Sequence, residues 1–232
     1  PLLAKRGFQG QIVTTFATAD LCQIMLRDSA HIQEFEAEWR NRKARRSGAE
    51  LYEPLYTMED AVNALQYFVP CDYDQKIELC EGVWVRFTDV GHLLGSASIE
   101  IWMCEDNVEK KIVFSGDVGN INQPIIKDPK TVRDYVVIES TYGNRLHGDE
   151  IPDYVGEFTR ILRETFAKGG NVVIPSFAVG RTQELLYFIR EIKEKKLLSD
   201  FPDFEVYVDS PLAIEATNVF QKNTKGCFDE DA

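Results

Sequence analysis

Histidine is scarce in this sequence of 232 residues, in which it occurs only as His31, His92 and His147. A metal site rich in histidine must therefore be incomplete within this chain. The five cysteines are odd in number and widely spaced, without a C-x-x-C pair, which argues against a disulfide framework or a cysteine-ligated zinc site. We expect reduced thiols in a cytoplasmic protein.

Long apolar runs, a signal peptide and an excess of positive charge are also missing. No run approaches the roughly 18 apolar residues of a membrane span, and the opening residues are not a signal peptide. The start without methionine indicates a piece of a longer protein. With 38 acidic against 26 basic residues, the formal net charge of -12 argues mildly against a nucleic-acid partner, because phosphate repels a negative surface. Loops of the G-x-G-x-x-G or Walker type are absent, so a nucleotide cofactor is unsupported.

The first part of the chain has the pattern of a mixed β region with helices. β-Branched residues at 11–16 predict a strand, and Thr18 is placed to cap the helix that follows. Thr57 and Asp60 form a capping pair at the start of a second helix. Alternation over 83–89 predicts a further strand. A hairpin and one more strand are expected at 98–103, 111–114 and 135–139.

After residue 150 the pattern changes to short strands that alternate with amphipathic helices. Helices are expected over 154–167, 181–195 and 213–221, and strands over 171–174 and 204–208. This alternation is typical of β-α-β units with a parallel sheet. We therefore expect an α/β chain of two parts, residues 1–145 and 146–232, of which the second belongs to a doubly wound α/β layer.

Three side chains suited to metal binding or acid–base chemistry lie near predicted strand ends. His92 precedes the hairpin, Asp117 follows it, and Glu139 ends the next strand. Because a hairpin returns the chain to its starting edge, the first two are expected at one end of the sheet. Glu139 reaches the same edge if its strand runs parallel to 111–114. Imidazole and carboxylate ligands so arranged suit a divalent cation, although each residue alone has a structural or turn role as its alternative.

Two basic features are candidates for phosphate binding. Residues 175–181 lie between a strand and a helix start, where free backbone N–H groups favour anions, and Arg181 adds a fork of donors. Structural packing of Arg181 at the junction of the two parts is the alternative. A run of five basic residues is a candidate nucleic-acid contact, with a solvated charge run as its alternative. The run consists of Arg40, Arg42, Lys43, Arg45 and Arg46.

Five segments that combine glycine with polar residues follow one another along the chain. They are residues 91–97 (GHLLGSA), 115–117 (SGD), 139–143 (ESTYG), 174–184 (IPSFAVGRTQE) and 208–213 (VDSPLA). In this order they resemble motifs of the β-CASP branch of the metallo-β-lactamase superfamily, and the resemblance covers nearly the whole chain. It implies part of a metallo-β-lactamase αββα sandwich, residues 1–145, followed by part of a β-CASP domain, residues 146–232.

The resemblance implies a zinc-dependent ribonuclease that hydrolyses RNA phosphodiester bonds with two metal ions. In such a site His92 would bind one zinc, Asp117 would bridge both, and Glu139 would orient a ligand imidazole or protonate the leaving oxygen. Ser140 and Thr141 would offer hydroxyls to the substrate, with turn capping as their alternative. Arg181 would bind a substrate phosphate.

The chain departs from the family pattern in its ligand set. The H-x-H-x-D-H motif, the H-x-S-G-H segment and the final ligand histidine are absent, and residues 5–8 (KRGF) resemble the stretch just downstream of the first of these. His31 lies on a predicted helix and His147 in a polar loop, so neither replaces them. We expect weak or no zinc binding and no activity from this chain alone, and self-association through an unpaired strand edge.

Two rival interpretations stay open. One is a non-catalytic RNA-binding or scaffolding homologue that has lost ligands. The other is a metallo-β-lactamase-fold hydrolase of small esters or thioesters. The β-CASP-like second part argues against the latter, because in the family that insert covers a cleft for a polymer.

Overall fold

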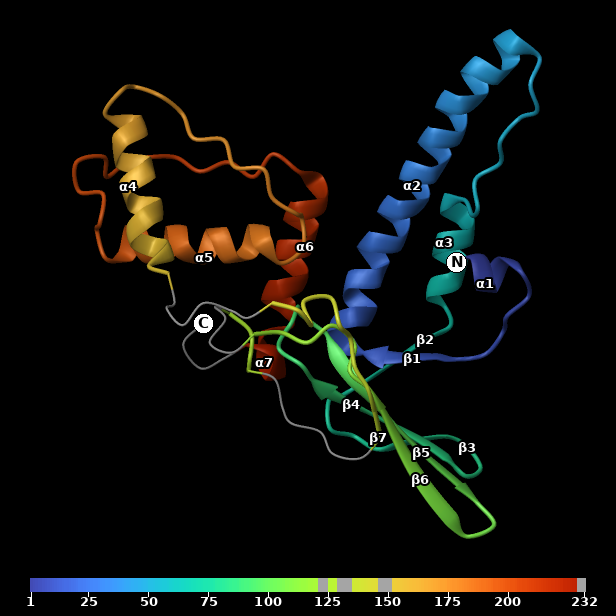
Figure 1. Ribbon diagram of the computed structural model, residues 1–232. Coiled ribbons are helices and arrows are strands. Elements are labelled where there is room, and N and C mark those ends of the chain that lie inside the picture. Colours follow the sequence, from blue (N-terminus) through green and yellow to red (C-terminus); the bar gives the residue numbers. More distant parts are fainter. Residues whose placement is uncertain (121–124, 129–134, 146–151, 229–232) are drawn as a thin grey trace.

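The structure is a computed structural model that describes residues 1–120, 125–128, 135–145 and 152–228 (Figure 1). Its strands are β1 (Ile12–Thr15), β2 (Phe68–Cys71), β3 (Ile77–Cys80), β4 (Val83–Asp89), β5 (Ala97–Glu105), β6 (Val108–Phe114) and β7 (Tyr135–Val137). Its helices are α1 (Leu2–Lys5), α2 (Phe16–Ser47), α3 (Met58–Leu65), α4 (Tyr154–Phe166), α5 (Arg181–Glu194), α6 (Pro211–Lys222) and α7 (Thr224–Cys227). The fold is mixed α/β, as the sequence predicts.

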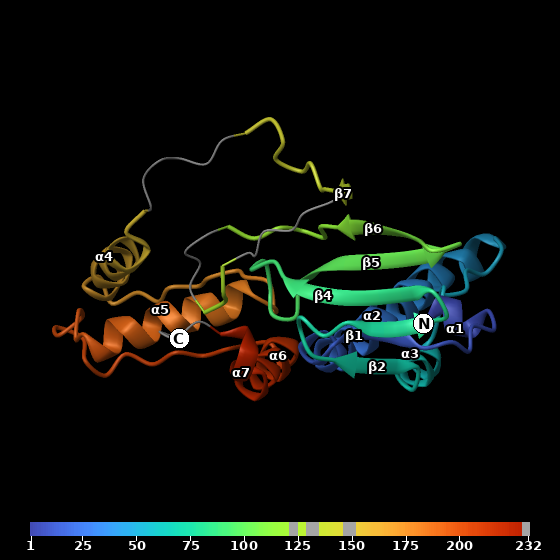
Figure 2. The ribbon, with the colours of Figure 1, turned by 90° about the horizontal axis from the view of Figure 1, so that it is seen from below.

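The strands form two sheets. The larger has the order β3-β4-β5-β6-β7 and is antiparallel except for its last pair, in which β7 runs parallel to β6. β1 and β2 form a separate parallel pair. In both ribbon views, strands β1 and β2 lie together with helices α1–α3 on one side of the larger sheet (Figure 2). The loops that follow β4, β6 and β7 emerge at the end of the sheet nearest α4–α6.

The hairpin of β5 and β6 is fixed by its turn. Asp106 and Asn107 have φ values of 50° and 63°, the left-handed conformation that two-residue hairpin turns use. Glu105 pairs with Val108, so the strands are longer and their connection shorter than the sequence pattern predicts. Because β7 is parallel to β6, both strands end at the same edge, as the sequence argument about Glu139 requires.

The helix starts follow side-chain caps. At α3 the Thr57 hydroxyl accepts a hydrogen bond from the Asp60 N–H, and the Asp60 carboxylate accepts one from the Thr57 N–H, which confirms the predicted capping pair. At α2 the prediction is wrong. Thr15 is the N-cap and accepts a bond from the Thr18 N–H, because β1 passes into the helix without a connecting loop. The helix then continues through the basic segment 40–46.

A hydrophobic cluster joins the end of the larger sheet to the helices. Its buried members are Ala17, Leu94, Ile125, Ile126, Phe220 and Cys227, and Val179 is among the partly buried side chains packed on it. Leu94 comes from the loop after β4, Ala17 from α2 and Phe220 from α6. The cluster therefore anchors the loop that carries His92 to two helices that are distant in sequence.

The strands predicted at 171–174 and 204–208 are not formed in the described structure. Both segments lie outside its strands, and Val173 and Tyr207 are 88% and 80% exposed. Segments of β-type sequence need a neighbouring strand for their backbone polar groups, and no described strand pairs with either of these. The division into residues 1–145 and 146–232 stays a prediction. None of the described helices has the length and hydrophobicity that crossing a bilayer requires.

Candidate active site

Two loops at the end of the larger sheet are in backbone contact. The loop after β4 carries His92, and the loop after β6 carries Asp117. The Gly119 N–H donates a hydrogen bond to the Val90 carbonyl oxygen at 2.8 Å. A Cβ atom at Gly119 would lie only 1.6 Å from the Gly91 carbonyl oxygen, so no other residue allows this approach without a shift.

Glu139 connects the end of β7 to the loop after β6. Its Oε1 accepts a hydrogen bond from the Val118 N–H at 2.8 Å, and its own N–H donates to Ser115 Oγ at 3.1 Å. The hydrogen bond from the Thr141 hydroxyl is the largest cause that lowers the pKa of Glu139; the Val118 bond and the charge of His92 also lower it. The structure thus gathers an ionised carboxylate and both candidate ligand loops at one edge.

The His92 loop is shaped by hydroxyl groups. Ser96 Oγ accepts hydrogen bonds from the N–H of His92 at 3.2 Å and from that of the next residue at 3.1 Å. At the end of the loop, the hydroxyls of Thr15 and Thr18 donate to the Gly95 carbonyl oxygen at 3.0 and 2.8 Å. The start of α2 therefore holds this loop in place. No pattern in the sequence marks these hydroxyl groups as positioning residues.

The start of α5 lies against the same loop. Gly180 has a φ of 87°, and a Cβ atom there would lie 2.5 Å from Leu93 Cδ2. Arg181 Nη1 lies 2.5 Å from Glu184 Oε2. Burial raises the pKa of Glu184, and Arg181 opposes this shift. The predicted phosphate-binding segment therefore adjoins the His92 loop, and the side chain of Arg181 is exposed and held by an acid rather than packed.

The two predicted substrate hydroxyls have different surroundings. Thr141 is exposed, and its hydroxyl is bonded to the Glu139 carboxylate. Ser140 is also exposed, and its carbonyl oxygen accepts the Gly143 N–H at 3.0 Å within a turn. Thr141 therefore orients the carboxylate, whereas Ser140 lies at the surface beside it.

The described residues do not complete a metal site. In the described part of the chain, no group of three or more His, Cys, Asp or Glu side chains is placed to hold an ion. His92 and Asp117 are suitable donor types, but zinc takes about four ligands. His31 is exposed on α2, and His147 lies outside the described residues. Any zinc bound through His92 and Asp117 requires further ligands.

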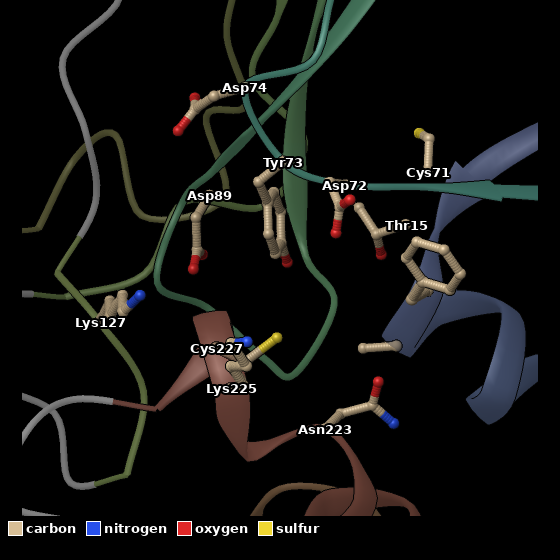
Figure 3. Close-up of a pocket in the computed structure, with 12 residues that line it drawn as sticks. Thr15, Cys71, Asp72, Tyr73, Asp74, Asp89, Lys127, Asn223, Lys225 and Cys227 are labelled. Carbon is tan, nitrogen blue, oxygen red and sulfur yellow. The ribbon is translucent and has the colours of Figure 1, made fainter.

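A pocket of about 310 Å³ lies beside the candidate site, between the ends of β1, β2 and β4 and the start of α7 (Figure 3). Its polar lining includes Asp72, Asp74, Asp89, Lys127 and Lys225. Tyr73 forms part of the wall, and its hydroxyl donates to the Ser96 carbonyl oxygen at 2.9 Å. Burial, assisted by Asp89, raises the pKa of Tyr73 and keeps this donor protonated. No sequence pattern indicates this pocket, because its residues come from elements far apart in the chain.

Comparisons with known proteins agree with this architecture. A sequence model of the Beta-Casp domain matches residues 182–232. Ribonuclease TTHA0252 of Thermus thermophilus is 30% identical over 224 residues, which are 96% of this chain and 45% of the relative. The RNase J-like protein of Methanocaldococcus jannaschii is 29% identical, over 90% of this chain and 44% of the relative. Cleavage and polyadenylation specificity factor subunit 3-I of Arabidopsis thaliana is 27% identical, over 94% of this chain and 29% of the relative.

These matches relate the chain to proteins with a Beta-Casp domain and to relatives named as a ribonuclease, an RNase J-like protein and a cleavage factor subunit. Over nearly its whole length the chain is therefore similar to the β-CASP branch of the metallo-β-lactamase superfamily, as the sequence motifs indicate. It spans less than half the length of the relatives named above.

Proposed function

We propose that the full-length protein is a metal-dependent hydrolase that cleaves RNA phosphodiester bonds. The observation that carries this proposal is the contact between the His92 and Asp117 loops at Gly119, with the Glu139 carboxylate bonded beside them. Relatives named as ribonucleases support RNA as the substrate class. A cytoplasmic location is part of the same proposal.

Zinc is the proposed metal, with His92 and Asp117 among its ligands and Asp117 as the bridge between two ions. Zinc bound at such a site lowers the pKa of a water molecule towards about 7 and stabilises charge on the phosphate. The remaining ligands lie outside the described residues in this proposal. Metal analysis tests it, with about two zinc ions per molecule expected for the full-length protein and weak or no binding for residues 1–232 alone.

Glu139 is proposed as a positioning residue. Its lowered pKa keeps the carboxylate ionised at neutral pH, which suits an acceptor of hydrogen bonds better than a donor of a proton to the leaving oxygen. By accepting a hydrogen bond from the Val118 N–H, it holds the loop of Asp117. It also interacts electrostatically with His92. Of the two roles that the sequence leaves open, the lowered pKa favours orientation of a ligand over protonation of the leaving oxygen.

The substrate strand is proposed to pass between Ser140 and the start of α5. Arg181 lies in the first turn of α5, where free backbone N–H groups favour phosphate. A phosphate there would compete with Glu184 for the guanidinium group. Self-association is a further proposal. It is supported by the exposed side chains of the edge strand β7, in which Tyr135 is 72% exposed and Val137 is 54% exposed.

Hydrolysis of a labelled 30-nucleotide RNA by the zinc-loaded full-length protein tests the proposed activity. Asp117→Ala is expected to lower kcat/KM by more than about 100-fold, because loss of a ligand exceeds the 10- to 100-fold typical of outer-shell changes. Asp200→Ala is the control, since among the described residues the one salt bridge of this exposed acid is a weak 3.8 Å pair with Arg163. Equal rates for both variants and wild type would exclude the metal role of Asp117.

Two other results would favour the rival functions. Binding of RNA without cleavage by the metal-loaded protein would favour a non-catalytic RNA-binding homologue. Cleavage of a thioester with no action on RNA would favour a hydrolase of small esters.

A further inference from the structure

The distal end of α2 forms a projecting surface that the proposed site does not use. We call residues 35–56 the arm: the last turns of α2 and the loop that returns to α3. In Figure 1 this end of α2 extends away from both the larger sheet and α4–α6. Residues 40–46 carry five positive charges and no negative one, in a chain whose net charge is -12.

Only part of this positive charge is neutralised locally. Arg42 Nη2 lies 2.7 Å from Glu38 Oε1, and Arg40 forms a longer pair of 3.8 Å with an acid one turn earlier. Lys43, Arg45 and Arg46 are exposed and form no salt bridge within the described residues. The tip of the arm therefore offers three cations to a partner.

Aromatic rings lie among these cations. Trp39 is 52% exposed, and Lys43 Nζ lies 3.8 Å from its ring centroid. Arg40 lies 4.6 Å from the ring centroid of Tyr52. Asn41 fixes this second ring, because its side chain donates to the Tyr52 carbonyl oxygen at 2.9 Å and accepts the Tyr52 N–H at 2.7 Å. Exposed rings beside cations are the surface on which single-stranded nucleic acid stacks its bases and places its phosphates.

The arm is joined to the candidate site by one rigid element. At its other end α2 holds the His92 loop through Thr15 and Thr18. A helix of 32 residues is about 48 Å long, at about 1.5 Å per residue. At about 3.4 Å per stacked nucleotide this distance corresponds to roughly 14 nucleotides.

We propose that the arm binds single-stranded RNA roughly 14 nucleotides from the cleavage site, so that long substrates are bound more tightly than short ones. The proposal rests on the proposed RNA hydrolysis and adds its dependence on length. RNA fits better than an acidic protein segment, because bases supply stacking partners for the rings of Trp39 and Tyr52 and carboxylate side chains do not.

The test compares a 5-nucleotide and a 30-nucleotide RNA with the zinc-loaded full-length protein. The arm variant carries Lys43→Gln, Arg45→Gln and Arg46→Gln, which keep good helix formers at exposed positions. The matched control carries the same three-charge change at exposed lysines outside the arm, as Lys110→Gln, Lys168→Gln and Lys196→Gln. Trp39→Ala tests the stacking contribution separately, and thermal unfolding checks that each variant is folded.

For the 30-nucleotide RNA, the arm variant is expected to raise KM about tenfold or more with kcat unchanged. The slope of log affinity against log salt should become shallower by about 2, since each single-strand phosphate contact contributes about 0.7. The 5-nucleotide RNA, which cannot reach both ends of α2, should show no change. The control variant should match wild type on both RNAs.

An equal effect of the arm and control variants, an equal effect on both RNAs, or equally tight binding of polyglutamate would overturn the proposal. Failure of the proposed function is seen separately. If wild type cleaves neither RNA, but the arm variant still loses affinity for the 30-nucleotide strand, the arm contact stands and the hydrolytic activity does not.

Discussion

Polar groups are paired differently in two regions of the molecule. These are the sheet region, residues 83–139, and the helical region, residues 154–228. In the sheet region the Glu100 side chain is 1% exposed, yet it is bonded to Arg86, Thr88 and Lys111. In the helical region the ion pairs of Arg160 lie on an exposed helix surface, and two β-type segments have no strand partner among the described residues. The buried carboxylate of the first region therefore has its partners within that region, whereas two segments of the second leave backbone polar groups without a strand partner among the described residues.

This difference explains where the candidate site lies. The predicted metal and acid–base residues His92, Asp117 and Glu139 follow strands of the sheet region. The antiparallel pairing of β4, β5 and β6 and the parallel pairing of β6 with β7 bring them to one edge. The helical region meets the His92 loop at Gly180 and in the hydrophobic cluster that joins Leu94 to Phe220. We therefore expect changes inside the sheet region to affect stability and activity together, and changes in the helical region to have smaller effects.

The largest effect is expected from Gly119→Ala. The added Cβ would lie 1.6 Å from the Gly91 carbonyl oxygen, so the two loops must separate. We expect a loss of about 3 kcal/mol in the free energy of unfolding, and of more than about 100-fold in RNA hydrolysis, from overpacking and misplacement of reacting groups. Urea unfolding and kcat/KM measure the two losses.

Gly170→Ala is the matched control in the helical region. Its added Cβ would lie 3.2 Å from Thr165 Cγ2 and 3.4 Å from the Thr165 carbonyl oxygen, contacts that a small shift relieves, and its φ does not require glycine. We expect the free energy of unfolding to change by less than about 1 kcal/mol and the rate of RNA hydrolysis to stay normal. Equal losses for both glycine variants would remove the distinction between the two regions.

The next largest effect concerns the buried carboxylate of the sheet region. Arg86→Ala removes bonds of 2.9 and 3.1 Å to Glu100 and leaves it with Lys111 and Thr88. We expect the free energy of unfolding to fall by about 2 kcal/mol. This is less than the roughly 3–5 kcal/mol typical of a fully uncompensated buried charge, because two partners remain. Urea unfolding measures it.

An exposed arginine in the helical region provides the comparison. Arg160 is bonded to Glu157 at 2.9 Å and Glu164 at 2.8 Å, but these groups are more than half exposed. Arg160→Ala should cost about 0.5 kcal/mol or less. A loss as large as that of Arg86→Ala would show that exposure is not what separates the two networks.

The contact between the regions is tested by a double-mutant cycle at Gly180 and Leu93. Gly180→Ala places a side chain at a φ of 87° and 2.5 Å from Leu93 Cδ2, with an expected loss of about 2 kcal/mol. In a Leu93→Ala background, only the backbone term of about 1 kcal/mol should remain. Additive losses in urea unfolding would mean that the two residues do not interact in solution.

Much of the sheet region could be predicted from sequence because its signals are local. Alternation over 83–89 and the polar turn at Asp106 fix an antiparallel hairpin, and the parallel pairing of β7 then brings Glu139 to the edge of His92 and Asp117. The capping pair at α3 is equally local. The hairpin and the capping pair need only neighbours within a few residues or one turn, whereas the parallel pairing of β7 is a condition that the sequence leaves open.

The rest depends on contacts between distant residues. Pairs such as Gly119 with Gly91, Gly180 with Leu93, and the start of α2 with Gly95 have no local pattern, so the sequence does not indicate them. Hydroxyl groups in a loop between strands are the only hint of the positioning role of Ser96. For 171–174 and 204–208 the β-type composition is a correct local signal, but a strand forms only where another strand is available to pair with it.

The smallest expected effect is a local titration at the edge where the loops meet. The pKa of Glu139 lies below its ordinary value of 4.5, first because of the Thr141 hydroxyl and then because of the Val118 N–H. A lowered pKa means that this bond is fully present above the ordinary value and is lost as pH falls through the lower folded value. The Val118 amide proton shift in the NMR spectrum should therefore titrate with a midpoint below 4.5, and Glu139→Gln should abolish this step. The Gly143 amide, bonded to a carbonyl, is the internal control. A Val118 midpoint at or above 4.5 would mean that Glu139 is not held by this loop, and its proposed positioning role would fail with it.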